Sequence, residues 1–304
     1  MKTNRIIIYE KLGSLLVLGM LFILANLSAY AQDEADSVVE QTAPKPIRDT
    51  FESAWLIDNQ SVMVPAKGTL EMDIMHRFGT VDKGYDNFFG IYAPSNIRIG
   101  MSYAPIRNLN VGFGFSKIQL TWDFNAKYAL LQQMESGGWP VSITYFGNIA
   151  IDTRSKENFV NESDRLSYFN QIIFARKVTA NFSVQVAPSL SHFNALEGYV
   201  NEDGQIRSKL KNDHFAIAFG GRYKITPAMA VMLNYDQPIT QHYINNPHPN
   251  ISFGIEVNTS AHAFQVFVTN YYNIIPQLNN LFNQNDLNDG QFLIGFNITR
   301  LWSF

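Results

Sequence analysis

The chain of 304 residues carries a formal net charge of −3, and 16% of its residues are charged. It contains no cysteine, which excludes disulfides, thiol chemistry and cysteine-ligated zinc or iron–sulfur sites. Soluble domains average about 25% charged residues, so part of this surface is expected to face something other than water, and the acidic balance gives no basic patch for nucleic acid.

The first 31 residues have the pattern of a secretory signal peptide. An apolar stretch at 12–27 follows three basic residues, and residues 29–31 (Ala-Tyr-Ala) form a small-x-small cleavage site. The three basic residues are Lys2, Arg5 and Lys11. We therefore expect export and cleavage near Ala31, with an uncleaved N-terminal anchor helix as the alternative.

Residues 32–68 are expected to form a periplasmic N-terminal segment that is partly disordered. Its first part is acidic and contains Pro44 and Pro46, a composition that favours disorder. From Phe51 to Gly68 the sequence is mixed and includes Trp55. This second part could pack at the mouth of the following domain or inside it, and the sequence does not decide between these places.

From residue 69 to residue 304 the hydrophobic pattern has a period of two, which is typical of strands with one apolar face. No stretch after residue 31 offers the roughly 18 consecutive apolar residues of a membrane helix. Twelve segments of near membrane-spanning length carry the pattern. They lie at about 70–78, 96–103, 109–116, 122–128, 141–149, 165–177, 182–191, 215–223, 229–236, 251–257, 264–269 and 292–304. The phase of 165–177 is ambiguous, and a β-bulge there would explain it.

Short and long connections alternate between these segments, as in outer-membrane barrels with short periplasmic turns and long external loops. Unpaired strand amides are too costly in lipid, so the segments must close on themselves. We predict an all-β protein: a transmembrane antiparallel up-and-down β-barrel of about 12 strands with periplasmic termini, in the outer membrane of a Gram-negative bacterium. A soluble periplasmic β-sandwich or barrel is the alternative.

The C-terminal segment 292–304 ends in Phe304 and resembles the signal by which Gram-negative outer-membrane proteins are recognised for insertion. We therefore assign Trp302 and Phe304 to an assembly signal. Three further stretches, His76-Arg77-Phe78-Gly79, Tyr85-Asp86-Asn87-Phe88-Phe89-Gly90 and Ile97-Arg98-Ile99-Gly100, with the closing Thr299-Arg300-Leu301-Trp302, resemble a family of uncharacterised outer-membrane β-barrels. The resemblance covers roughly residues 51–304 and implies a barrel fold without assigned chemistry.

Charged residues on the polar phase of the strands are expected to line the lumen. They are Glu71, Asp73, Arg77, Arg98, Asp123, Lys127, Arg222, Asp236 and Glu256. Strand direction places Arg77, Arg98, Asp123 and Asp236 toward the outside and the others toward the periplasm. Both layers mix signs, so the charges could form a structural ion-pair network or a polar constriction that selects solutes.

Signals for an enzyme or a metal site are weak. Standard nucleophile, zinc and phosphate-binding motifs are missing from the sequence. His242 and His248 share a loop, and His192 and His214 flank another, without the spacing of a standard metal site, so we interpret them as surface polar residues. We expect no cofactor.

The leading functional hypothesis is a narrow channel or transporter for small solutes. A closed barrel that docks an envelope partner and an outer-membrane enzyme are the alternatives. The expected partners are outer-membrane lipid, the barrel-assembly machinery and either a small solute or an envelope protein, but not nucleic acid.

Overall fold

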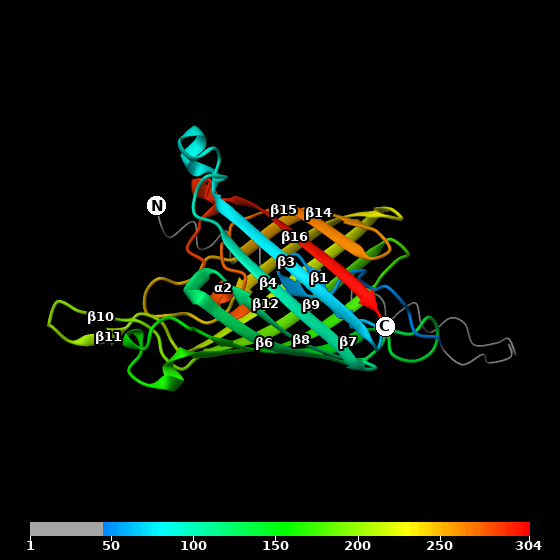
Figure 1. Ribbon diagram of the computed structural model, residues 1–304, viewed down its shortest axis with the longest axis horizontal. Helices are drawn as coiled ribbons and strands as arrows, with labels where there is room; N and C mark the ends of the chain where they lie inside the picture. The colour runs from blue at the N-terminus through cyan, green and yellow to red at the C-terminus, as the bar shows by residue number, and fades with distance from the viewer. Residues whose placement is uncertain (1–44) are drawn as a thin grey trace, which may run out of the picture. The chain divides into compact units, whose positions relative to one another are not determined.

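A computed structural model describes residues 45–304, and within them twelve antiparallel strands close into one barrel (Figure 1). The strands are β3 (Thr69–Thr80), β4 (Asn96–Ile106), β5 (Leu109–Ser116), β6 (Thr121–Leu131), β7 (Ser142–Ile151), β8 (Leu166–Lys177), β9 (Phe182–Phe193), β12 (Asp213–Thr226), β13 (Met229–Pro238), β14 (Asn250–Asn258), β15 (His262–Thr269) and β16 (Leu293–Ser303). Each strand pairs with its neighbours in chain order, and β16 pairs with β3 to close the barrel. The predicted closed antiparallel barrel of about twelve strands is therefore confirmed.

One end of the barrel carries short turns, apart from the longer β6–β7 connection at 132–141, and the other end carries most of the long loops. The short-turn end also holds the C-terminus, where the Phe304 amide donates a hydrogen bond to the Gly68 carbonyl, 3.2 Å. The long-loop end carries the η2 loop (Val81–Asn87), the η4 and η5 turns (Lys156–Asn158, Glu162–Arg165) and the β10–β11 hairpin (Gly198–Val200, Ile206–Ser208). The loop from β15 to β16 contains α2 (Pro276–Phe282) and η6 (Leu287–Asp289). The η3 turn (Ile118–Leu120) is the shortest connection at this end.

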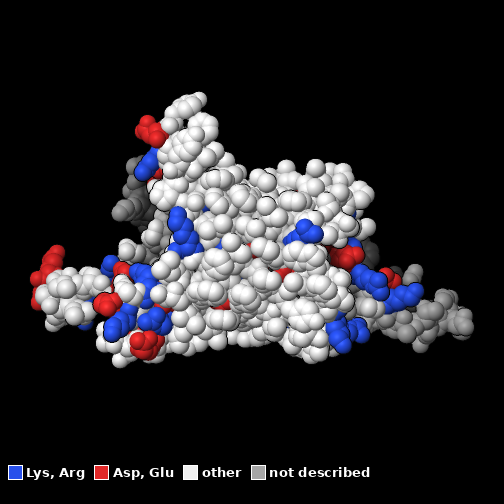
Figure 2. Space-filling view, viewed as in Figure 1, with Lys and Arg blue, Asp and Glu red and all other residues white. Residues whose placement is uncertain are grey.

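The wall separates side chains by strand parity. Along β3, buried and partly exposed residues alternate from Thr69 to Thr80, and the buried phase carries the charges. The exposed phase is apolar: Val111, Phe253 and Ile255 are 40%, 57% and 45% exposed. Lys, Arg, Asp and Glu gather mainly at the two ends of the barrel, and most of the wall between them is uncharged (Figure 2). This is the surface that a barrel in hydrocarbon needs.

The ambiguous phase of the β8 segment comes from the barrel interior and not from a bulge. The register of β8 against β7 and β9 does not shift. Its inward residues include Phe169 and Ile173, which are 3% and 0% exposed and belong to an apolar cluster inside the lumen. Because both faces of β8 are partly apolar, a two-residue period could not identify the lipid-facing side. Register shifts occur instead in the pairs β4–β5, β6–β7, β12–β13 and β16–β3.

Two more elements lie inside the barrel, and both come from outside the wall strands. The short strands β1 (Trp55–Leu56) and β2 (Asn59–Gln60) form a hairpin in the N-terminal part of the chain. The helix α2 enters from the long-loop end. Among the described residues, no helix is long and apolar enough to cross a membrane. The predicted signal peptide and most of the predicted disordered lead, residues 1–44, lie outside the described residues.

Candidate functional site

Residues 51–64, here called the plug, occupy the lumen. Most of them are buried, and Leu56 and Ile57 are completely inaccessible to solvent. The two residues that connect β1 to β2 are Ile57 and Asp58. Ile57 has a φ of +62°, a left-handed conformation that is unusual for a β-branched residue, so the contacts around this tip must hold the turn in place. The segment that the sequence left undecided therefore enters the barrel.

The wall holds the plug backbone through side-chain donors from six strands. The amide group of Asn297 donates to the Ile57 carbonyl, 2.5 Å, and that of Asn234 donates to the Leu56 carbonyl. Further bonds run from Gln265 to Trp55 (2.8 Å), Gln185 to Gln60 (3.0 Å), Thr144 to Val62 (3.2 Å) and Lys127 to Ala54 (3.3 Å). These bonds satisfy carbonyl groups that are otherwise costly to bury. The polar side chains on the inner face of the wall thus supply the donors that the carbonyl groups of the plug backbone need.

An ion-pair cluster ties the base of the plug to the wall near the short-turn end. The Arg222 guanidinium pairs with the Glu256 carboxylate at 2.8 Å and with Glu52 of the plug at 2.9 Å. Lys224 also pairs with Glu52, at 2.5 Å, and the Ser53 hydroxyl donates to Glu256, 2.7 Å. Paired in this way, buried charges escape the cost of isolated ones.

A second ion-pair cluster joins residues of β3, β4 and β6 on the inner face of the wall. The Arg98 guanidinium contacts Asp73 at 2.6 Å and grips Asp123 with two bonds of 2.8 and 2.9 Å. The sequence interpretation put Asp73 in the periplasmic layer and the other two in the outer layer. The cluster joins the two layers, because Arg98 and Asp73 are only two register positions apart, a distance that an arginine side chain spans. Arg98 also lies over the Trp55 ring of the plug, 5.6 Å from its centroid.

The tip of the plug meets a segment that enters from the opposite end. Residues 271–285, here called the cap segment, include α2. The Asp58 carboxyl accepts a hydrogen bond of 2.5 Å from the Tyr271 hydroxyl and another from the Asn279 amide. Next to it, Asn59 donates to the Asp236 carboxylate, 2.8 Å. Plug, cap segment and wall are therefore joined at one polar point.

The cap segment is itself anchored to the wall. Gln277 donates to Asn148 at 3.1 Å, and Asn283 donates to Asn250 at 2.9 Å. Ile275, Leu278 and Leu281 pack in an apolar cluster at the long-loop end. Beside Glu71, Arg98 and Lys127, plug and wall leave a cavity of about 10 Å³, which holds at most one water molecule.

The structure places all nine predicted lumen charges inside the barrel, each 5% exposed or less. Seven of them take part in the contacts described above, either with the plug or within the Arg98 cluster. The Lys127 ammonium donates to Gln60 at 2.7 Å, and Glu71 lines the same small cavity as Lys127. Arg77 bonds Asn297 at 3.0 Å and lies over the Phe267 ring at 4.5 Å.

The small residues of the wall have a direct structural reason. A Cβ at Gly114 would lie 2.4 Å from Arg98 Nη2, and one at Gly220 would lie 2.5 Å from Leu56 Cδ2. Such distances are shorter than any real contact, so these glycines make room for the ion-pair cluster and for the plug. The sequence left open whether they serve an open channel or a folded-in segment, and they accommodate the second.

The histidine interpretation needs correction. His214 and His242 are 0% and 6% exposed and stack on each other, with Nδ1 of His214 2.9 Å from Nε2 of His242. They were expected at the surface, but His214 occupies a buried position of β12, and His242 reaches it from loop 239–249. Among residues 45–304, no three His, Asp or Glu side chains lie together as a metal site.

The predicted assembly residues lie at the short-turn end. Trp302 is in β16, opposite Leu70, with the Arg300 guanidinium 4.9 Å from its ring centroid. The strand ends at Ser303, so Phe304 follows it and is 87% exposed. Their role in insertion stays a prediction.

Sequence reasoning missed the functional residues of the plug tip and the cap segment. Asp58, Tyr271 and Asn279 lie outside the period-two segments, so no strand pattern identified them. One signal was available: the apolar pair Leu56 and Ile57 follows a polar lead, and such a pair needs a buried place.

A family model described as "Membrane bound beta barrel domain (DUF5777)" matches residues 51–302. No curated protein matches the chain. Among solved structures, the NanC porin is 8% identical over 77% of this chain and 99% of its own, with a TM-score of 0.48. The KdgM porin is 9% identical over 78% and 99%, with a TM-score of 0.41. An outer-membrane channel from Pseudomonas putida F1 is 10% identical over 79% and 97%, with a TM-score of 0.47.

Proposed function

This chain belongs to the family of membrane-bound β-barrel domains (DUF5777), and we propose that it is a gated channel for small solutes. In this proposal the short-turn end faces the periplasm and the long loops face outward. The structure corresponds to the closed state, and solutes pass when the plug leaves its seat.

The observation that carries the proposal is the polar contact between plug and wall. An interior needed only for stability is filled most favourably by apolar side chains, because a buried ion pair is often no better than a hydrophobic replacement. Here Lys127, Arg222 and Asp236 instead bond to plug residues. If the plug left, these same side chains would face water and could be solvated again. A wall of this kind is suited to both a closed and an open state.

The position of the plug in the chain also supports gating. Residues 51–64 come before the first wall strand, so their removal from the lumen breaks no strand pairing of the barrel. The cost of opening is then limited to the contacts of the plug itself. Lumen width sets the size of the solute, since a barrel of this strand number is intermediate between filled small barrels and wide porins.

Solute uptake by proteoliposomes tests this proposal. The mature protein is reconstituted, and swelling is followed with uncharged solutes of increasing size, from glycerol to trisaccharides. We expect slow uptake of the smallest solutes, which increases when Glu52 and Ser53, at the base of the plug, are both replaced by Ala. Equal swelling of vesicles with and without protein, for the native chain and for this variant, would reject the channel.

A docking barrel is the second candidate, and one observation favours it. The connection from β3 to β4, which contains η2, carries exposed aromatic side chains, and Tyr85 and Tyr92 are 83% and 80% exposed. Exposed aromatic clusters often mark interaction sites. Retention of a closed lumen under every condition, together with loss of complex formation on Tyr85→Ala and Tyr92→Ala, would favour this alternative.

A further inference from the structure

A cavity of about 590 Å³ opens at the long-loop end, above the cap segment. Its volume is within the range of small-molecule sites, about 300–1,000 Å³. Its lining comes from several connections at this end: residues 118–121, residues 152–165, both ends of the β9–β12 connection, Asn245, and the cap segment with α2. The hydrogen bonds and ion pairs described above between plug, cap segment and wall do not depend on this cavity.

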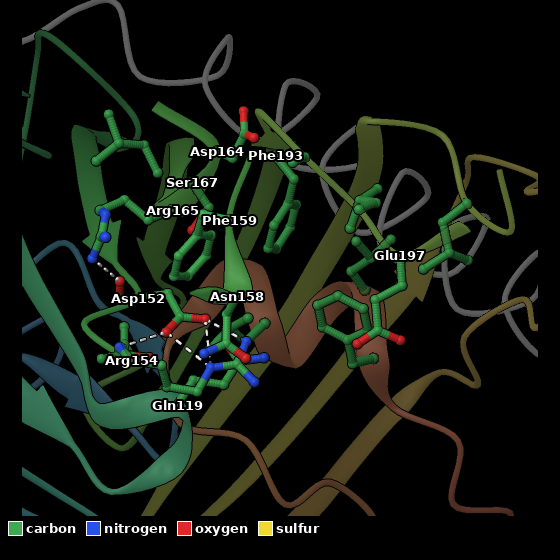
Figure 3. Close-up of a pocket in the computed structure, with 18 of the residues that line it drawn as sticks. Gln119, Asp152, Arg154, Asn158, Phe159, Asp164, Arg165, Ser167, Phe193 and Glu197 are labelled. Atoms are coloured by element: carbon green, nitrogen blue, oxygen red, sulfur yellow. Dashed lines mark hydrogen bonds and ion pairs between the residues drawn. The ribbon is translucent and has the colours of Figure 1, made fainter. Parts of the chain in front are cut away.

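Three phenylalanine rings from three different parts of the chain line the cavity. Phe159 comes from the β7–β8 loop, Phe193 from the end of β9, and Phe282 from α2. In Figure 3, Phe159 and Phe193 point into the same space. Phe193 and Phe282 meet edge to face, with centroids 5.5 Å apart, and Leu278 and Leu281 of α2 extend this apolar surface. These aromatic and aliphatic side chains therefore form an apolar surface against which the flat face of a ligand ring can pack.

The charges around the cavity balance. Three acidic and three basic side chains line it. They are Asp152, Asp164 and Glu197, and Arg154, Arg165 and Lys209. Several are already paired: Arg154 bonds Asp152 at 2.6 Å, and the Arg165 guanidinium lies over the Phe159 ring at 4.7 Å. A charged ligand would find no excess of the opposite sign.

Uncharged polar groups complete the lining. The amide side chains of Gln119, Asn158 and Gln284 border the cavity, and each offers both a donor and an acceptor. Hydroxyl groups, which also donate and accept, match such partners without introducing a charge.

We propose that this cavity, here called the vestibule site, binds an uncharged amphipathic solute with one apolar ring face and several hydroxyl groups. Its floor is α2, whose Asn279 bonds Asp58 at the plug tip. The site is thus placed to receive a solute before it enters the lumen. Binding itself does not depend on the proposed channel, whereas the role as an entry site rests on it.

Isothermal titration of the full chain tests binding without any measurement of transport. The protein is folded in a detergent without a sugar headgroup, and the probe is phenyl β-glucoside. Phenyl phosphate and phenyltrimethylammonium serve as an anion and a cation with the same ring. We expect the glucoside to bind at least tenfold tighter than either ion. No binding of the glucoside, or equal binding of the three compounds, would overturn the proposal.

Variants then locate the site. We expect Phe282→Ala to weaken glucoside binding at least tenfold, and Tyr85→Ala, an exposed aromatic of another loop, to leave it unchanged. Phe159→Ala, in a surface loop, replaces Phe282→Ala if that variant does not fold. Unchanged affinity in a folded variant of either ring would also overturn the proposal. Binding without solute uptake would retain the vestibule site and reject the channel.

Discussion

The hydroxyl of Tyr271, at the start of the cap segment, donates a 2.5 Å hydrogen bond to the carboxyl of Asp58 at the tip of the plug. The two residues are 213 positions apart in the chain. This contact joins the segment that enters from the short-turn end to the one that enters from the loops. Movement of one segment must therefore break a bond to the other.

Asp58→Asn should make the channel open more often. The amide keeps the size of the side chain but removes the charge, and it cannot accept from both Tyr271 and Asn279 at the same sites. A hydrogen bond to a charged group contributes about 1.5–3 kcal/mol, so the open population should rise roughly tenfold or more. Single-channel recording measures this population. Asp86→Asn removes an exposed acid from η2 at the long-loop end and is the matched control. Equal open populations in both variants would contradict the role of the Asp58–Tyr271 contact in keeping the channel closed.

Arg98→Met should strongly destabilise the barrel. It leaves Asp73 and Asp123 buried side by side without their cation, a loss of about 3–5 kcal/mol. Guanidinium unfolding in lipid vesicles measures the free energy. Replacing Asp73 and Asp123 by Asn in the same chain should recover part of it, because the uncompensated charges are then gone. Native stability of the single variant would show that Arg98 does not hold this cluster.

Gly220→Ala should loosen the plug, whereas Gly221→Ala should not. The new Cβ at Gly220 would collide with Leu56, while a Cβ at Gly221 meets nothing within 4 Å. Both variants make the same chemical change in the same strand. Hydrogen exchange of the plug amides, read by mass spectrometry, should become faster in the first only. Equal hydrogen-exchange rates of the plug amides in the two variants would contradict the packing of Leu56 against β12.

Val111→Arg and Ile255→Arg should each cost about 2–4 kcal/mol, the range for a cation near mid-bilayer on the lipid face. Unfolding in vesicles again measures the effect. Val160→Arg changes a loop residue that is 93% exposed and should leave stability unchanged. Tolerance of arginine at the two wall positions would place these side chains away from hydrocarbon.

The long-loop end should become less stable in weak acid. Burial, with a smaller contribution from the nearby Lys211 ammonium, lowers the pKa of His242 below its ordinary value. The unfolded chain then binds this proton more readily than the folded chain. The contribution of His242 is complete above about pH 6.5, the ordinary pKa of histidine, and is lost as the pH falls through the lowered pKa.

Hydrogen exchange of the Lys211 amide, which donates to His242 Nδ1 at 2.9 Å, follows this effect after correction for intrinsic rates. Protection should decrease from pH 7.5 to pH 5.0. His242→Gln should show less of this dependence. A native chain with constant protection over this range would contradict the assignment.

The wall of the barrel could be predicted from the sequence because its two environments differ sharply. Lipid on one side and polar contacts on the other impose a strict period of two, and residues such as Val111 and Arg98 follow it. The closing of the lumen could not be predicted in the same way. Its contacts join residues such as Asp58 and Tyr271, which are far apart in the chain and belong to no periodic segment. The ion-pair partners of the inner charges could not be predicted either. The two-residue period places Arg98 on the inner face of the wall, but it does not show which acidic side chains Arg98 contacts.

The claim that solutes pass only when the plug leaves the lumen is tested most directly by a reducible disulfide between plug and wall. The chain has no cysteine of its own, so Leu56→Cys with Gly220→Cys adds a single pair. A Cβ at position 220 lies 2.5 Å from Leu56 Cδ2, so a side chain at position 220 is within reach of one at position 56. Conductance of the same reconstituted molecules is recorded before and after reduction. The gated-channel account predicts no openings while the disulfide is intact and discrete openings after reduction. Identical conductance in the two states, with the disulfide verified, would contradict it.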